Sequence, residues 1–470
     1  MPTMKMRNIF CLCCLALVAG YLPAQNTERT QPNTVDTRIQ RAVAAVSADR
    51  LQASDLALVN FGTRHTLGTN LPPEKKAGVV QAQEWLTAQL QRLAAQCQGC
   101  LEVKTHTSTE GPSARIPQPT KLVTVYAVQK GSDAEASKRV ILICAHYDTI
   151  AMARMNDPEA PAPGANDDGS GTSLVLEAAR VLSQQKFPAT IVYAIFPGEE
   201  QGLFGSKSFA RSMARGWKLE AVLSNDIVGG DNTREQQGLA RVFSEGIPAQ
   251  LLAEGQMLGE NDVPGLRRLR LLGAESDSPS RQLARYIASE VVRYLPESSV
   301  QPKLVFRQDR FLRGGDHTSF NEQGIAAVRI TEFAENYDHQ HQLPRVENGI
   351  EYGDLLKFVN FEYLAGVTRL NVATAGLLAA APAAPAEVKL RTKELVNSST
   401  LHWAASPDGL ATGYEVLYRD TTSAQWEKVI PAGSQFEITI PYSKDNGVFA
   451  VRAYDADGHR SLPVYPLPER

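Results

Sequence analysis

Residues 190–200 read TIVYAIFPGEE, an apolar run that ends in two adjacent acids. The continuous apolar stretch 191–196 is typical of a strand that is covered on both faces. Pro197 and Gly198 then break the strand and turn the chain. Two carboxylates at such a break are costly unless a cation lies close, and a metal would let Glu199 and Glu200 divide ligation and proton transfer between them. A solvated acidic turn is the alternative interpretation of this segment.

The segments around this strand alternate between β and α patterns. Strands are predicted at residues 122–128, 140–145, 221–226, 304–306 and 326–330, and helices at 35–58, 76–95, 169–184, 280–294 and 352–375. Strands that alternate with helices predict an α/β domain. We therefore expect a mainly parallel mixed sheet flanked by helices, over residues 25–376.

The pattern changes beyond an Ala/Pro-rich linker at residues 377–386. Short strands separated by turn residues follow over residues 387–470, which predicts a small all-β sandwich. This part resembles a fibronectin type III domain. Trp403 and the segments 413–416 and 448–454 carry the resemblance.

The N-terminus has the pattern of a secretory signal peptide. Lys5 and Arg7 precede an apolar run at residues 9–22, and Ala24 offers a cleavage site. The run is too short for a transmembrane helix. We therefore expect residues 1–24 to be removed, a periplasmic or secreted protein, and no stable membrane insertion afterwards. In an oxidising compartment Cys97 and Cys100 could form a small-loop disulfide.

Composition is that of an ordinary soluble protein. The chain has 470 residues, 43% of them hydrophobic and 21% charged, with a formal net charge of -3. This charge gives no reason to expect nucleic acid as a partner. The length predicts more than one domain. We expect a monomer.

Acids and one histidine follow several predicted strands. His146 and Asp148 follow the strand at 140–145, Asp226 ends the strand at 221–226, and Asp167 and Asp168 precede a helix. Ligands collect outside the carboxyl ends of strands in open α/β sheets, and converging acids there would repel one another without cations. With Glu200 these residues supply donors for two zinc ions, provided that a later histidine joins them. The later histidines are His317, His339 and His341.

At this point residues 120–375 strongly resemble the family of co-catalytic di-zinc aminopeptidases, which is related to glutamate carboxypeptidases and glutaminyl cyclases. Each of the motifs is weak alone, and their order makes the set strong. They are His146-Tyr147-Asp148, the segment GANDDGSG at 164–171, GEEQG at 198–202, Asn225-Asp226 and Gly315-Asp316-His317.

The resemblance implies a role for each matching residue. The expected zinc ligands are His146, Asp167 as the bridge, Glu200, Asp226 and His341. His146 and Asp226 would share one ion with Asp167, and Glu200 and His341 would hold the other. Asp148 would orient His146, and Glu199 would be the general base and acid. His339 competes with His341, and Asp168 could be confused with Asp167.

Three further residues are candidates for the rim of the site. In some family members a tyrosine directly precedes the last histidine ligand and assists the oxyanion. Gln340 stands at that position here and Tyr337 lies further upstream, so an oxyanion role for Tyr337 is open. Asp316 and His317 are expected at the pocket rim or in a structural role.

The resemblance predicts a secreted zinc metallopeptidase that releases N-terminal amino acids from peptides. A zinc-bridged hydroxide would attack the peptide carbonyl while Glu199 takes and returns the proton. One alternative keeps the fold but makes the enzyme a carboxypeptidase, with Arg313 or Arg329 holding the substrate carboxylate, or a glutaminyl-cyclase-like enzyme with one zinc. The other is an inactive peptidase-like binding protein. The intact set of ligands and base argues against the cyclase and the binding protein.

Overall fold

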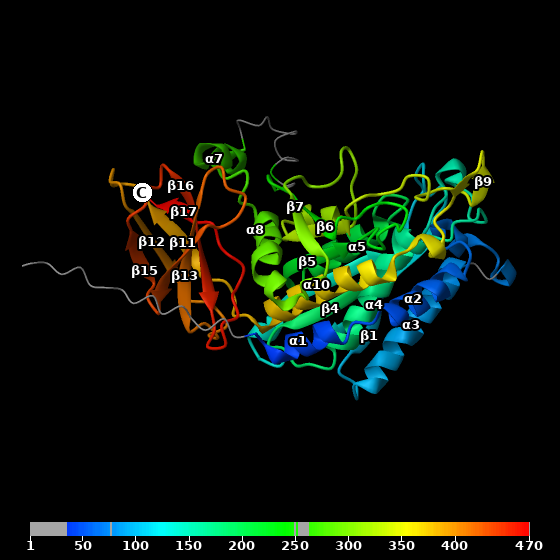
Figure 1. The fold of residues 1–470 in the computed structure, drawn as a ribbon, viewed down its shortest axis with the longest axis horizontal. Helices are drawn as coiled ribbons and strands as arrows, with labels where there is room; N and C mark the ends of the chain where they lie inside the picture. The colour runs from blue at the N-terminus through cyan, green and yellow to red at the C-terminus, as the bar shows by residue number, and fades with distance from the viewer. Residues whose placement is uncertain (1–34, 76–77, 249–250, 252–262, 470) are drawn as a thin grey trace, which may run out of the picture. The chain divides into compact units, whose positions relative to one another are not determined.

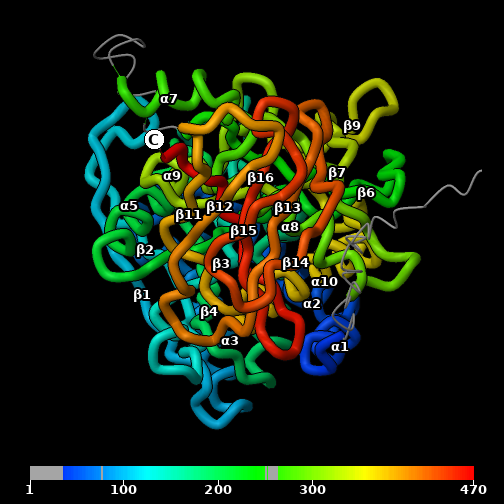
Figure 2. The backbone as a smooth tube through the Cα atoms, turned by 90° about the vertical axis from the view of Figure 1, so that its left-hand side faces the viewer, coloured from blue at the N-terminus to red at the C-terminus, as the bar shows by residue number. Residues whose placement is uncertain are grey.

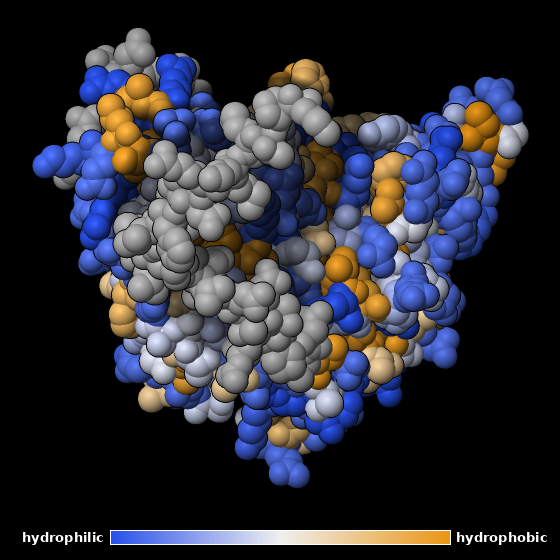
Figure 3. Space-filling view, turned by 60° about the vertical axis from the view of Figure 1, so that its left-hand side comes forward, coloured by the Kyte–Doolittle hydropathy of each residue, from blue (hydrophilic) through white to orange (hydrophobic). Residues whose placement is uncertain are grey.

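The structure is a computed structural model and describes residues 35–75, 78–248, 251 and 263–469 of the chain. The predicted signal peptide lies outside these residues. Among the described residues, no helix has the length and apolar content needed to cross a membrane. Figure 3 shows one face of the molecule, on which hydrophilic side chains predominate and apolar ones occur in small groups.

An eight-stranded mixed sheet forms the centre of the α/β domain (Figure 1), in the order β1-β2-β4-β3-β5-β8-β6-β7. The apolar run before the two adjacent acids forms β4 (Thr190–Phe196), which pairs in parallel with β3 (Arg139–His146). The parallel pairing continues from β3 to β5 (Lys218–Asn225) and from β5 to β8 (Ala327–Glu332). Because these four strands run the same way, their carboxyl ends meet at one edge of the sheet.

Strands at both sides of this parallel set complete the sheet. β2 (Thr120–Gln129) pairs antiparallel with β4, and β1 (Glu102–Glu110) pairs antiparallel with β2. On the other side β6 (Leu239–Ser244) is antiparallel to β8 and parallel to β7 (Gln301–Val305). The predicted mainly parallel mixed sheet is confirmed.

Both faces of the sheet are buried, as the continuous apolar runs predict. On β4, Ile191, Tyr193 and Ile195 belong to one core, and the alternate residues Val192, Ala194 and Phe196 belong to another. The first core is covered by the helices α1 (Thr37–Ala44), α2 (Ala48–Val59), α3 (Gly78–Gln96), α4 (Gly171–Leu182) and α10 (Phe361–Ala380). The second is covered by α5 (Phe204–Met213) and α9 (His317–Asn321).

The sequence prediction differs from the structure in several elements. Residues 35–58 form two helices because Ser47 caps α2, its side chain accepting a hydrogen bond from the Arg50 amide. The strands β1 and β6 were not predicted. β1 reads EVKTHTSTE and has no apolar alternation, since it lies at the edge of the sheet with neither face fully buried. The predicted helix at 280–294 is α8 (Pro279–Tyr286), followed by short π and 3₁₀ turns.

The C-terminal part consists of two small sheets that share one core. Their strand orders are β15-β12-β11-β17 and β14-β13-β16, and Figure 2 shows this part of the chain in orange and red, facing the viewer. The strands are β11 (Ala386–Arg391), β12 (Ser399–Ala404), β13 (Gly413–Asp420), β14 (Lys428–Gly433), β15 (Glu437–Ile440), β16 (Gly447–Tyr454) and β17 (Leu467–Glu469). Trp403 from one sheet and Val416 from the other lie in the shared core. Helix α10 continues to Ala380, inside the segment predicted as a linker, and β11 begins at Ala386.

Buried ion pairs connect the C-terminal sheets to the α/β domain. Asp277, which is fully buried, pairs with Arg285 at 3.1 Å and with Arg419 of β13 at 2.6 Å. Arg452 of β16 pairs with Glu290 at 2.7 Å. These contacts make the C-terminal sheets part of the same packed structure as the sheet that carries the site.

Candidate metal centre

The predicted ligands converge at the carboxyl edge of the parallel strands. His146 ends β3, Glu200 follows β4, and Asp226 follows β5. Asp167 precedes α4, and His341 lies in the loop after β8. The structure forms two groups whose ligand atoms lie within 4.8 Å of one another, one of His146, Glu199 and Asp226 and one of Asp167, Glu200 and His341.

Asp167 lies between the two groups. One carboxylate oxygen, Oδ1, is 3.3 Å from Nε2 of His146, and the other, Oδ2, is 2.8 Å from Nε2 of His341. His341 Nε2 is also 3.1 Å from Oε1 of Glu200, and His146 Nε2 is 3.9 Å from Oδ2 of Asp226. A carboxylate that faces one histidine with each oxygen has the arrangement required to bridge two cations.

The donor atoms themselves indicate a metal. Among the described residues, His146 Nε2, Glu200 Oε1 and His341 Nε2 are buried and have no hydrogen-bond partner of acceptable geometry. Unsatisfied buried polar atoms are costly, and three of them directed at common points need a compensating ligand. Imidazole nitrogens with carboxylate oxygens are donors that suit zinc. The residues therefore fit zinc, and Asp167, which faces both histidines, suits a centre of two ions.

Asp148 has a wider role than the orientation of His146. The ring atom Nδ1 of His146 contacts the Asp148 main-chain oxygen at 3.2 Å and its carboxylate at 3.6 Å, so Nε2 is left facing the centre. The same carboxylate accepts hydrogen bonds from the backbone amides of Glu199 and Glu200, both at 3.2 Å. Asp148 thus positions the histidine of one group and both acids of the turn after β4.

The structure separates the roles of Asp167 and Asp168, which are joined by a cis peptide bond. The Asp168 carboxylate accepts hydrogen bonds from the backbone amides of His146 at 3.1 Å and Gly171 at 2.9 Å, so it supports the loop. Asp354, which no sequence pattern indicated, accepts a hydrogen bond from the Asp167 amide at 2.7 Å. It lies far from the motifs along the chain, and no local signal marks it.

Comparison with known proteins identifies the family. Residues 124–343 match the family model described as "Peptidase family M28". A "Probable zinc metalloprotease" from Leptosphaeria maculans is 38% identical over 92% of this chain and 97% of that protein. This protein belongs to peptidase family M28. Another "Probable zinc metalloprotease", from Pyricularia oryzae, is 38% identical over 92% of this chain and 85% of that protein. The LapA aminopeptidase of Legionella pneumophila shares the fold, with a TM-score of 0.51 and 19% identity over 76% of this chain and 78% of that one.

In this M28 peptidase, Glu199 stands beside the His146–Asp226 half of the centre. Its side chain is half-buried and its carboxylate lies within reach of both ligands. Burial raises the pKa of Glu199 well above its ordinary value, and the charges of Asp226 and Glu200 add to the increase. A carboxyl group whose proton affinity is raised in this way is suited to carry protons at a metal centre.

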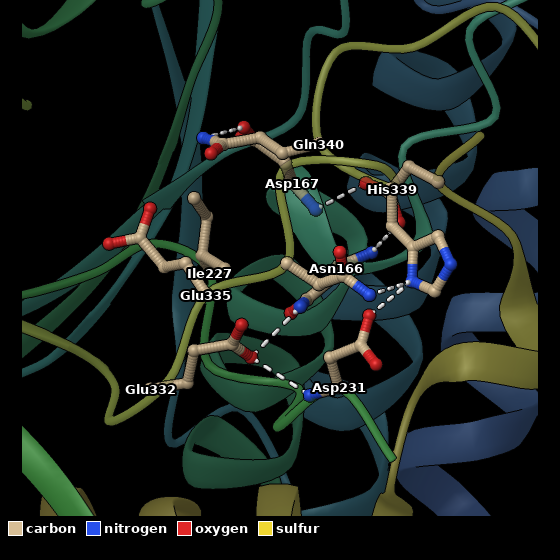
Figure 4. Close-up of a pocket in the computed structure, with 10 residues that line it drawn as sticks. Asn166, Asp167, Ile227, Asp231, Glu332, Glu335, His339 and Gln340 are labelled. Atoms are coloured by element: carbon tan, nitrogen blue, oxygen red, sulfur yellow. Dashed lines mark hydrogen bonds and ion pairs between the residues drawn. The ribbon is translucent and has the colours of Figure 1, made fainter. Parts of the chain in front are cut away.

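The competing histidines lie elsewhere. His339 stacks on Phe358 at a centroid distance of 3.6 Å and contacts Asp231. His339 and Asp231 both line the cavity that is shown in Figure 4. His339 therefore does not face the ligand groups, whereas His341 does. His317 is buried and its Nε2 lies 2.9 Å from the main-chain oxygen of Gln308.

The two remaining candidates for the rim of the site, Asp316 and Tyr337, differ in burial. Asp316 is buried, and within the described residues its Oδ1 has no hydrogen-bond partner. Burial raises the pKa of Asp316 to about 7, and the charges of Asp148 and Asp226 contribute to the increase. Tyr337 is 63% exposed, so its hydroxyl is not held against the ligands in this structure.

Proposed function

We propose that this M28 peptidase is a secreted di-zinc aminopeptidase that releases N-terminal amino acids. The observation that carries the proposal is the position of Asp167, one oxygen of which faces His146 and the other His341. Two zinc ions held there would supply Lewis acidity and an activated water. His146 and Asp226 would hold one ion, Glu200 and His341 the other, and Asp167 both.

The protein's own residues account for proton transfer and for orientation. Glu199 is placed to take a proton at its carboxylate and return it to the leaving amine. Asp148 fixes the direction of Glu199 and Glu200 through their backbone amides. Asp354 does the same for Asp167. Because these supports are hydrogen bonds to main-chain groups, they hold the acids in place while leaving the carboxylate oxygens free.

The distribution of cations favours an aminopeptidase over a carboxypeptidase. A carboxypeptidase needs a cation to hold the substrate carboxylate. Arg329 is fully buried and pairs with Asp226, so it does not meet that need. Arg313 is the other candidate; its side chain is 35% exposed and lies 3.5 Å from Glu335. A carboxypeptidase that uses Arg313 is therefore the second candidate function.

Glu332 and Glu335 line the cavity next to Asp167 that is shown in Figure 4. Glu332 is buried, and its Oε1 has no hydrogen-bond partner in the part of the chain that the structure describes. Burial raises the pKa of Glu332 to about 8, so its carboxyl group is largely protonated at neutral pH and does not by itself select between an amine and a carboxylate end group of a substrate.

Hydrolysis of a matched set of peptides tests the proposal. One sequence is prepared with free termini, with an acetylated N-terminus and with an amidated C-terminus. We expect cleavage of the free and amidated peptides and loss of cleavage on acetylation. Equal cleavage of the acetylated peptide would refute the aminopeptidase, and loss on amidation together with loss in Arg313→Met would establish the carboxypeptidase.

Two further measurements test the cyclase-like enzyme, the binding protein and the cellular location. About two zinc ions per chain support the di-zinc peptidase, about one a cyclase-like enzyme, and none a binding protein. Removal of residues 1–24 would leave Gln25 at the mature N-terminus. Sequencing the N-terminus of the protein recovered outside the cytoplasm tests that expectation, and an intact residue 1 would refute it.

A further inference from the structure

One arginine contacts a predicted zinc ligand directly. Arg329 lies on β8 and is fully buried. Its Nη2 is 2.8 Å from Oδ1 of Asp226, while the other oxygen of that carboxylate, Oδ2, faces His146. The guanidinium thus pairs with one oxygen of Asp226, and the second oxygen faces the metal centre.

The same guanidinium holds a loop against the centre. Its Nη1 donates a hydrogen bond to the main-chain oxygen of Gly314 at 3.0 Å and lies 3.5 Å from Asp309. At Gly315 there is no room for a side chain, because a Cβ would lie 2.6 Å from Nη1 of Arg329 and 3.5 Å from Oδ2 of Asp226. The Arg329 guanidinium is therefore closely packed between Asp226 and this loop.

The two halves of the centre differ in whether an arginine pairs with a carboxylate ligand. In the Glu200–His341 half, Oδ2 of Asp167 accepts a hydrogen bond from the neutral side-chain amide of Gln340, whose Nε2 lies 3.2 Å away. Glu200 Oε1 lies 3.1 Å from Nε2 of His341. In the part of the chain that the structure describes, no Lys or Arg side chain pairs with the carboxylate of Asp167 or Glu200. The charge of a buried cation acts strongly over a few ångströms because little water screens it.

We propose that Arg329 is a positioning residue that makes the two halves of the centre unequal, by lowering the zinc affinity of the His146–Asp226 half relative to the Glu200–His341 half. The positive guanidinium partly neutralises the negative charge of the Asp226 carboxylate. A carboxylate whose charge is partly neutralised binds a zinc ion less tightly. The inference rests on the proposed two-zinc centre, and it does not depend on which end of a peptide the enzyme attacks.

Zinc affinity, measured without any substrate, tests the inference. The zinc-free protein is titrated with zinc in competition with a chromogenic chelator, which yields two dissociation constants. In the wild type we expect the second zinc to bind at least tenfold more weakly than the first. In Arg329→Met we expect the weaker constant to tighten by tenfold or more while the tighter one stays within threefold.

Two variants keep the experiment decisive. Arg329→Lys keeps the charge and loses the planar fork, so its weaker constant should stay near the wild-type value. Arg285→Met is the matched control, because Arg285 is also fully buried and also pairs with a buried aspartate, Asp277. In Arg285→Met, Asp277 would still pair with Arg419, just as Asp309 would still pair with Arg310 in Arg329→Met. Arg285→Met should leave both constants unchanged. Circular dichroism confirms that each variant is folded.

The outcomes distinguish the inference from the function on which it rests. Binding of one zinc only, in the wild type and in every variant, would refute the two-zinc centre and the inference with it. Two zinc ions with equal constants in the wild type, or a weaker second site in Arg329→Met, would refute the role of Arg329 and leave the two-zinc centre standing.

Discussion

His459 joins the two ends of the described chain and makes stability depend on pH. Its Nδ1 contacts Asp455 at 2.7 Å and its Nε2 contacts Asp36, the N-cap of α1, at 3.0 Å. Burial by itself lowers the pKa of His459, but the two carboxylates outweigh it and raise the pKa from 6.5 to about 9. The charged imidazole is thus favoured in the folded state.

The sign and size of the effect follow from the shift. A histidine whose pKa is raised on folding stabilises the protein fully below its unfolded pKa, and the contribution is lost as pH rises through the folded pKa. With the unfolded pKa near 6.5, the contribution is about 2.5 kcal/mol at pH 7 and falls to roughly zero by about pH 10.

Denaturant unfolding at a series of pH values checks this prediction. The free energy of unfolding is compared between the wild type and His459→Gln, because other groups that titrate in this range cancel in the difference. The difference should be about 2–3 kcal/mol at pH 7 and should disappear by about pH 10. His402→Gln is the matched control, since His402 is half-buried and pairs with Glu469 within the C-terminal sheets.

Two results would contradict the reasoning about His459. A difference that stays constant from pH 7 to pH 10 would show that packing, not charge, accounts for the effect of the substitution. A difference that grows with pH would mean that the neutral imidazole is the stabilising form.

Three other changes test the site and the fold. Glu199→Gln should lower kcat by about 10²–10⁴-fold in a peptide assay while zinc content by atomic absorption stays as in the wild type, because Glu199 is assigned to proton transfer; loss of zinc would make it a ligand instead. Gly315→Ala should destabilise the protein by about 1–3 kcal/mol in denaturant unfolding, since the added Cβ would meet Arg329 at 2.6 Å, and an unchanged midpoint would show that the loop can shift freely. Trp403→Ala should cost about 3–5 kcal/mol because Trp403 is 4% exposed in the C-terminal core, and a cost below about 1 kcal/mol would show that this core is loosely packed.

Much of the fold was predictable because burial leaves a local pattern. Continuous apolar runs predicted β3 and β4, since both faces of these strands are covered, and the acids just beyond the runs predicted the edge where the site lies. The polar edge strand β1 has no such pattern. It is a strand only because β2 offers it a partner, in a register that runs from Glu102 opposite Val128 to Glu110 opposite Thr120.

The support of the site could not be predicted from the sequence. Asp354 and Arg329 contact the predicted ligands, yet each lies more than a hundred residues from its partner, and neither belongs to a motif. From the sequence, Arg329 is a candidate only as a cation that holds substrate, because a sequence does not show whether an arginine is buried. Such pairings exist only once separate strands and loops meet at one edge.

The sequence by itself determined the residue types of the centre and their order along the chain. It contained the acids after β4 and the candidates His339 and His341, but it left the choice between these two histidines to family resemblance. The tertiary structure decided that choice, because it places His341 2.8 Å from Asp167 and stacks His339 on Phe358. The physical reason is that ligation requires atoms to converge within a few ångströms, and that convergence is a property of long-range packing, not of any local pattern.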